Sequence, residues 1–176
     1  MLITDPVNIQ YATGATNMSV FTARTPARYL LVFAAGPVIL FDFFGGEHLA
    51  ADLLTIDEVR GARALCFVSS NGFVVEQSQA LAAEIAGLVH DQLGRLDRLA
   101  IDRFRFETAD ALRTAGFDLT DADPILSRAR RIKQPIELSF MREAMHRVEA
   151  ATTVFEDRLR PEIGRASCRE RVCLAV

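Results

Sequence analysis

The stretch DPVNIQYATGATNMSVFTARTPARYLLVFAAGPVILFDFF, residues 5–44, decides the fold of this chain. It contains two short apolar runs, residues 29–33 and 38–43, joined by Ala-Ala-Gly-Pro at 34–37. Apolar runs separated by a Gly-containing loop of this length predict a β-hairpin. Because both runs are almost continuously apolar rather than alternating, we expect both faces of the hairpin to be covered by other elements.

A short helix and a polar loop precede this hairpin. Asp5 is a good N-cap residue, and Pro6 suits the first helical position because its missing N–H needs no partner there. Thr13 and Gly14 predict the turn that ends the helix, and residues 15–27 form a polar loop. Leu2 and Ile3 indicate the end of a first strand.

Strands and helices alternate after the hairpin. The longest helix, Val74–Leu93, carries a shared apolar face and ends before Gly94. Around it the pattern predicts a short helix at 46–54, a strand at 64–68, a strand at 99–102, a helix at 105–115 and a strand at 117–119. Alternation of this kind predicts an α/β fold, and the hairpin makes its sheet mixed.

A basic linker and a long helix follow the α/β region. Asp123-Pro124 begins a turn of helix, and RARRIK at 128–133, with Arg128, Arg130 and Arg131, reads as a solvated linker. A helix is predicted from Pro135 to about Leu159. Its apolar positions recur at steps of three and four, and nothing later in the sequence would cover them: Leu138, Met141, Met145, Val148, Thr152, Phe155 and Leu159.

The composition is that of a soluble globular protein. At 176 residues, with 50% apolar and 24% charged residues, one main domain with a sizeable core is expected. No apolar run is long enough for a membrane span, and MLITDP is not a secretory signal. The net charge of −3 and the lack of a basic stripe argue against nucleic acid as a partner.

The cysteines indicate a cytoplasmic protein. Cys66 lies in an apolar run and is expected to be a small buried residue, whereas Cys168 and Cys173 lie close to the carboxyl terminus. Their spacing predicts neither disulfides nor a metal site. The histidines His48, His90 and His146 are isolated, so they form no paired-ligand motif either.

The opening motifs resemble a known family. Asp5-Pro6, Asn8-Ile9, Tyr11 and Thr13-Gly14, together with FDFFGGEHL at 41–49, are similar to the N-terminal domain of the creatinase/aminopeptidase P/prolidase family. Within it, the stretch is most similar to a subgroup that includes dimethylsulfoniopropionate lyases. The similarity covers roughly the first 160 residues. It implies a ribonuclease H-like mixed sheet flanked by helices, followed by the first helix of a pita-bread domain.

This resemblance implies where the catalytic metals belong. In the family, two divalent ions (Mn, Zn, Fe or Co) are held by two Asp, one His and two Glu of the pita-bread domain. None of these ligands maps onto this chain, so we expect no cofactor and no activity from it alone. The family also has a helix before the first strand, and its absence here predicts that Met1 is an internal or premature start.

We therefore expect three segments. Residues 1–130 form the N-terminal domain, and 131–162 form the linker and first helix of a truncated catalytic domain. Residues 163–176 are expected to be non-native, because IGRASCRERV at 163–172 resembles a translated sequencing adapter. A natural basic tail is the alternative for this last segment.

The motif DFFGGEH at 42–48 is the first candidate site. Asp42, Glu47 and His48 are polar residues between a strand end and a predicted helix, a position that often lines a site. The structural alternative is that Glu47 supports the first helical turn and Asp42 accepts hydrogen bonds from the following loop.

The loop at 16–25 is the second candidate. Family members are dimers in which the equivalent loop reaches the neighbouring active site. The resemblance therefore implies that Asn17, Met18, Phe21 and Arg24 contact substrate in a homodimer. An ordinary surface loop is the alternative for each of these residues.

Three functions remain open. The main expectation is the substrate-access and dimerisation domain of a dinuclear-metal hydrolase resembling Xaa-Pro aminopeptidase, prolidase or creatinase, acting on a peptide or small molecule. The alternatives are the same domain of a dimethylsulfoniopropionate lyase-like member, and a binding or dimerisation module that never catalyses.

Overall fold

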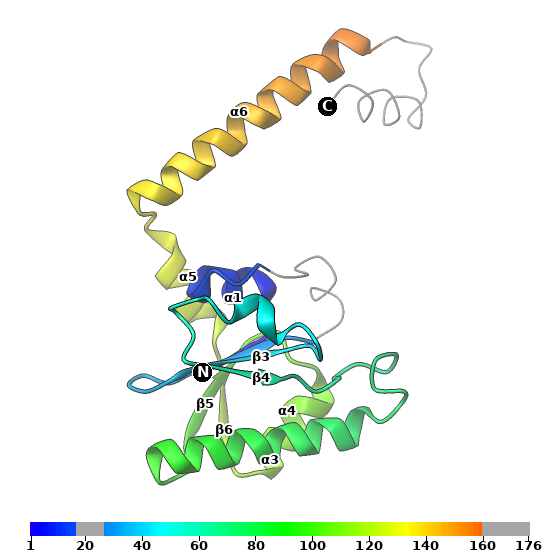
Figure 1. The fold of residues 1–176 in the computed structure, drawn as a ribbon, viewed down its shortest axis with the longest axis vertical. Coiled ribbons are helices and arrows are strands. Elements are labelled where there is room, and N and C mark those ends of the chain that lie inside the picture. Colours follow the sequence, from blue (N-terminus) through cyan, green and yellow to red (C-terminus); the bar gives the residue numbers. More distant parts are fainter. Residues whose placement is uncertain (17–26, 160–176) are drawn as a thin grey trace. The chain divides into compact units, whose positions relative to one another are not determined.

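The computed structural model describes residues 1–16 and 27–159, which are drawn as ribbons in Figure 1. The chain divides into two compact units, Met1–Ser127 and Arg128–Val176, and each is considered by itself. Within the described ranges, no helix has the length and apolar character that a membrane crossing requires.

A six-stranded mixed sheet, with strand order β4-β3-β2-β1-β5-β6, forms the centre of the first unit. β2 runs antiparallel to its neighbours β1 and β3, and the remaining neighbours are parallel, which confirms the predicted mixed α/β fold. The strands are β1 (Leu2–Ile3), β2 (Tyr29–Val32), β3 (Val38–Asp42), β4 (Glu58–Gly61), β5 (Arg98–Ile101) and β6 (Asp118–Asp121).

The predicted hairpin is the β2–β3 pair, and both of its faces are covered. In register, Leu30 lies opposite Leu40, and Tyr29 lies opposite Phe41. Side chains alternate along a strand, so these two pairs enter different hydrophobic clusters on opposite faces of the sheet. The rings of Tyr29 and Phe41 stack with centroids 4.6 Å apart. The nearly continuous apolar sequence of both strands follows from this double burial.

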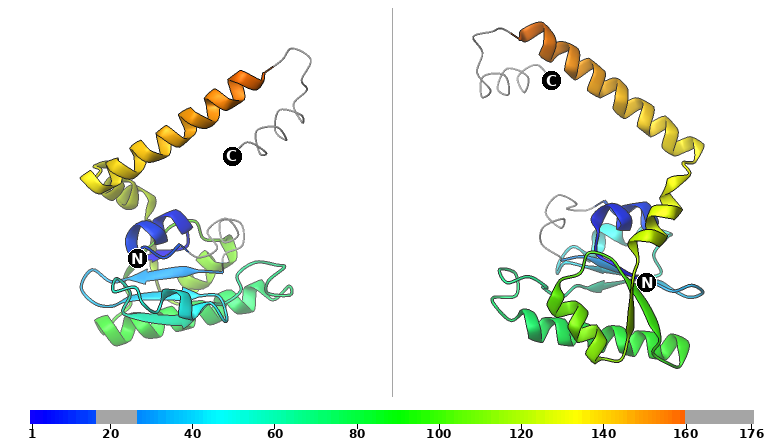
Figure 2. Two further views of the ribbon diagram at one scale, coloured as in Figure 1. Left: turned by 45° about the horizontal axis from the view of Figure 1, so that its top comes forward. Right: turned by 180° about the vertical axis from the view of Figure 1, so that it is seen from behind.

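Helices pack on both faces of the sheet (Figure 2). α3 (Val74–Leu93) and α4 (Phe106–Thr114) cover the face that includes Tyr29, and α1 (Pro6–Thr13) and the 3₁₀ helix η1 (Glu47–Ala50) cover the other. α3 has its predicted bounds, and Gly94 closes it with a left-handed φ of 70°.

The predicted strand at 64–68 is wrong. Residues 62–65 are coil and 66–70 form a turn, in which Leu65 is buried while Phe67 and Val68 are 70% and 88% exposed. The strand instead lies earlier, as β4, and pairs in parallel with β3 from Ile39 and Glu58 onward. Its sequence EVRG is polar because β4 is an edge strand with largely accessible side chains.

Two further elements differ from expectation. The short helix predicted at 46–54 is only the four-residue η1 followed by turns. The basic segment expected as a linker is helical up to Arg131, as part of α5 (Asp123–Arg131). Leu126, in the first turn of α5, packs against the cluster beneath α1.

The second unit contains the predicted long helix, α6 (Pro135–Arg158). Pro135 occupies the first turn, and the Gln134 amide donates a 2.7 Å hydrogen bond to the Glu137 side chain. No residue of this helix is buried, so its apolar side chains are accessible to solvent from one end of the helix to the other.

Candidate functional site

Two buried or half-buried carboxylates, Asp42 and Asp102, lie with their partners at one edge of the sheet. Because β1, β3, β4, β5 and β6 are mutually parallel, their carboxyl ends lie at the same edge, where antiparallel β2 begins. In open α/β sheets this edge is the usual place for a binding site. We call it the carboxyl edge.

A buried ion pair, Arg28 with Asp42, lies at this edge. Arg28 Nε donates to Asp42 Oδ1 at 3.2 Å, and Nη2 donates to Oδ2 at 2.6 Å, with both residues at most 2% exposed. Such two-pronged pairing fixes the relative orientation of both side chains. Arg28 immediately precedes β2 and Asp42 ends β3, so the pair connects the base of the loop before β2 to the base of the loop after β3.

Asp42 also accepts a hydrogen bond from the loop that follows it, which was the structural alternative to a role in substrate contact. The Phe43 amide donates to Asp42 Oδ1 at 2.9 Å, and the Asp42 carbonyl accepts from Ala62 N at 2.6 Å. Gly46 lies directly under the Phe43 ring, because a Cβ placed there would be 2.5 Å from a ring carbon. Any larger residue at position 46 would therefore force the Phe43 ring to move.

Glu47 and His48 lie on η1, just beyond this loop. Glu47 is half-buried and His48 is exposed. Within the described residues, no hydrogen bond or ion pair connects either of them to Asp42. The motif thus separates into a buried structural carboxylate and an accessible Glu-His pair, and the substrate-contact role of these residues stays a prediction.

A second carboxylate, Asp102, joins the ends of β1 and β5. Asp102 Oδ1 accepts hydrogen bonds from Thr4 N at 2.6 Å and Thr4 Oγ1 at 3.0 Å. Its Oδ2 accepts from Asp5 N at 3.1 Å and Asn8 Nδ2 at 3.4 Å. Asp102 therefore holds the start of α1 against the sheet.

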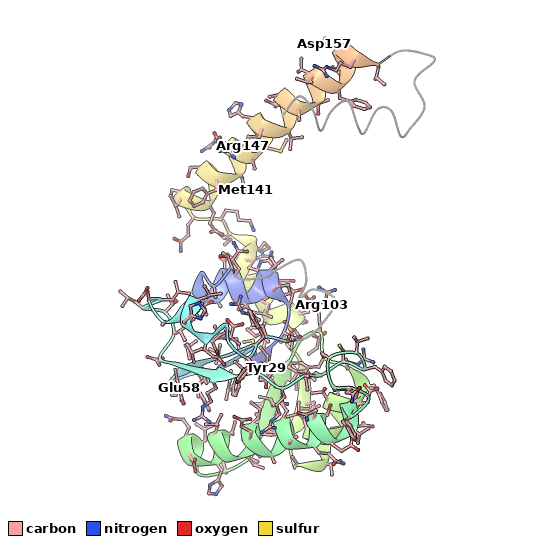
Figure 3. The ribbon with its side chains drawn as sticks, turned by 45° about the vertical axis from the view of Figure 1, so that its right-hand side comes forward. Tyr29, Glu58, Arg103, Met141, Arg147 and Asp157 are labelled. Atoms are coloured by element: carbon pink, nitrogen blue, oxygen red, sulfur yellow. The ribbon has the colours of Figure 1, made fainter. Side chains whose placement is uncertain are left out.

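Asp5 caps α1 and pairs with a cation. Its Oδ1 accepts from the amides of Val7 and Asn8 at 2.9 and 3.1 Å, which confirms the predicted N-cap. Arg103 Nη1 donates to Asp5 Oδ2 at 2.6 Å, beside α1 in Figure 3. Partial burial opposes ionisation of Asp5, but the hydrogen bonds from Arg103 and the two amides outweigh it, so the pKa of Asp5 lies below its ordinary value.

Cys66 is half-buried rather than buried as expected, and it lies in the turn at 66–70. Its Sγ is 2.9 Å from Ser69 Oγ. Burial alone would raise the pKa of this thiol. Hydrogen bonds from the Ser69 side chain and from the Val68 and Ser69 amides lower it by more, so the pKa of Cys66 lies below its ordinary value. No second reactive group in the described residues accompanies Cys66, and the turn alone defines no reaction.

The other predicted contacts cannot be compared with the structure. Asn17, Met18, Phe21 and Arg24 lie outside the described residues. Arg28 was missed, although the hairpin register carried a signal: with Tyr29 opposite Phe41, positions 28 and 42 are the next facing pair. Asp102 carried no local signal, because its partners are 94–98 residues away in sequence.

The described residues do not fit a metal centre. Residues 1–16 and 27–159 hold no group of three or more His, Cys, Asp or Glu side chains that could bind an ion. Asp42 and Asp102, the carboxylates that reach the carboxyl edge most directly, are occupied by Arg28 and by the amino end of α1. Their arrangement positions the loops at this edge.

The mixed six-stranded sheet, the helical layers on its two faces and the ion pairs that anchor its carboxyl edge define an α/β domain. The chain belongs to the creatinase/prolidase N-terminal domain family, whose model matches residues 1–132. This finding confirms the family that the opening motifs indicated.

Two relatives are dimethylsulfoniopropionate lyases. The chain is 31% identical over 164 residues to the dimethylsulfoniopropionate lyase DddP of Roseobacter denitrificans, a match covering 93% of this chain and 37% of the relative. It is 29% identical over 170 residues to the enzyme of the same name from Roseovarius nubinhibens, covering 97% of this chain and 38% of that protein. The chain thus spans less than two-fifths of the length of these relatives.

Proposed function

We propose that this chain is the N-terminal domain of an enzyme of the dimethylsulfoniopropionate lyase type, in which a catalytic domain follows α6. The observation that carries the proposal is the extent of the match. The family model ends at residue 132, whereas the similarity to the Roseobacter lyase covers 164 residues and so extends into α6. The relationship therefore includes the segment that would connect the two domains.

The lyase alternative is better supported than the peptidase expectation. Both named relatives are lyases, whereas the main expectation from the sequence was a hydrolase resembling Xaa-Pro aminopeptidase, prolidase or creatinase, with the lyase as its alternative. The role proposed for the domain is to border the substrate site and to support a homodimer. In this role the Arg28–Asp42 pair would hold the two loops of the carboxyl edge in a fixed relation.

The divalent ions implied by the family would be held outside the described residues, which do not fit them. The role of this domain would therefore be to position the loops that border the substrate site. Its contribution is the anchoring of Thr4, Asp5 and Asn8 by Asp102, and of the flanking loops by Asp42.

A pair of chimaeras tests this function. Residues 1–159 of this chain would replace the corresponding segment of the Roseobacter lyase in one chimaera and of a prolidase in the other. We expect the lyase chimaera to consume dimethylsulfoniopropionate, followed by proton NMR, and the prolidase chimaera to hydrolyse Xaa-Pro dipeptides poorly. Circular dichroism and size-exclusion chromatography would establish that both chimaeras are folded and show whether they are dimers.

The reverse pattern, with Xaa-Pro hydrolysis in the prolidase chimaera and no turnover by a folded lyase chimaera, would contradict the proposal. Full activity of the lyase with this segment deleted would favour the third possibility, a module that takes no part in catalysis.

A further inference from the structure

A groove of about 450 Å³ runs between α3 and α4, in the helical layer that covers the face of the sheet including Tyr29. A volume of this size is typical of small-molecule sites. Ten residues line it: Val75, Gln79, Ala82 and Ala83 from α3, Phe106, Glu107, Asp110, Ala111 and Thr114 from α4, and Ala115 just after it.

The floor of the groove consists of small side chains. Ala82 and Ala111 are buried and belong to the main hydrophobic cluster, and Ala115 packs against the same cluster. Alanine leaves space between the two helices that a leucine or methionine would fill. At the mouth, Val75 and Phe106 are 53% and 75% exposed, so an apolar surface faces the solvent there.

The α4 wall is acidic. Glu107 and Asp110 lie three positions apart on one helix face, and the residues that line the groove include no cationic side chain. Arg105 contacts Glu107 at 3.4 Å and Arg113 contacts Asp110 at 3.3 Å, but both arginines lie outside the lining and are largely exposed. Exposed pairs of this kind are weak and exchange readily with another cation.

We propose that this groove binds a small organic cation with an apolar body, such as an alkyl- or arylammonium ion. The body lies on the alanine floor, and the cationic head lies between the Glu107 and Asp110 carboxylates. The Phe106 ring adds a favourable face for the positive charge. None of the lining residues belongs to the Arg28–Asp42 pair or to the Asp102 cluster, so this proposal does not depend on the role proposed for the carboxyl edge.

An NMR titration of the whole 176-residue chain tests this site, with 2-phenylethylammonium as the probe and the neutral 2-phenylethanol as its matched control. For a ligand of this size in an open groove, we expect a dissociation constant on the order of 1 mM. Amide shifts should be confined to α3 and α4. The neutral alcohol should bind about tenfold more weakly, since it lacks both carboxylate contacts and the cation–π contact.

Three variants separate charge from shape. The double substitution Glu107→Gln and Asp110→Asn should remove most of the preference for the ammonium ion over the alcohol, leaving only the part that the Phe106 ring contributes. Ala83→Leu, which fills an exposed position of the groove with a good helix former, should abolish binding of both compounds. Glu76→Gln removes an acidic residue of α3 that does not line the groove, and it should change nothing.

Equal affinity for the ammonium ion and the alcohol would overturn the proposal, as would undiminished binding by the folded double variant. Amide shifts located outside α3 and α4, or no shifts at several millimolar probe, would do the same. Circular dichroism of each variant distinguishes loss of the site from loss of the fold.

Discussion

Arg28 and Asp42 form the most completely buried charged pair among the described residues. Their two hydrogen bonds fix the position of the start of β2 relative to the end of β3 at the carboxyl edge. Both side chains are almost inaccessible to water, and both oxygens of the carboxylate are engaged. A buried pair is not by itself strongly stabilising, because both ions lose their hydration. Removing one partner is far more costly, since it leaves the other charge buried without compensation.

The substitution Arg28→Met should therefore lower the free energy of unfolding by about 3–5 kcal/mol. The matched control is Arg60→Met, which removes an arginine from an exposed pair with Glu58 and should cost at most about 1 kcal/mol. Urea unfolding of the whole chain gives both values. The double variant Arg28→Met and Asp42→Leu should recover part of the loss. If Arg28→Met costs no more than Arg60→Met, the pair does not anchor the edge.

Asp5 should make the stability of the domain dependent on acid pH. Its pKa is lower in the folded protein than the ordinary value of 3.8, so the charged form stabilises the fold above that pH. This contribution is lost as the pH falls through the folded-state pKa. Asp5→Asn keeps a capping side chain but loses the charge that pairs with Arg103.

The difference in unfolding free energy between wild type and Asp5→Asn should consequently be constant at neutral pH and shrink below about pH 4. Urea unfolding at a series of pH values measures it. A difference that stays the same down to the acid limit would mean that Asp5 acts only as a neutral cap.

At the level of elements, the local sequence pattern was sufficient to predict a strand or helix wherever its apolar residues form a continuous run or recur with a clear period. The β2–β3 hairpin, α3 and α6 were predicted from apolar runs, helix-ending glycine and three–four spacing, and all are present. β5 and β6 were predicted within one or two residues of their bounds. These elements carry their own signal because each has a regular apolar face, which the strands and α3 bury in the core and α6 leaves accessible.

β4 was missed because its evidence is not local. EVRG has no apolar run, and its strand geometry comes from pairing with β3. The nearby apolar residues 64–68 attracted the prediction instead, although only Leu65 of the five enters the core. The same limit applies to the site. The motif singled out Asp42 as a substrate contact but did not reveal its pairing with Arg28, and Asp102 depends on partners that only the folded sheet brings together.

At the scale of the whole molecule, the two compact units differ in what they bury. The first unit has hydrophobic clusters on both faces of its sheet. In the second, α6 presents Met141, Met145 and Val148 without burying any of them. An isolated helix is marginal in water unless such a stripe is packed. This contrast fits an α/β domain with its own hydrophobic core, joined to a helix whose apolar stripe would pack against another surface.

Hydrogen exchange on the purified chain, as a dilute monomer, tests this central claim most directly. We predict that amides of β2 and β3 are protected to the level of global unfolding, because those strands are buried on both faces. Amides of residues 141–155 in α6 should exchange orders of magnitude faster, since helix–coil opening of an unpacked helix is frequent. Protection in α6 equal to that of β3 would contradict the account, because it would show that the apolar stripe is already packed within this chain.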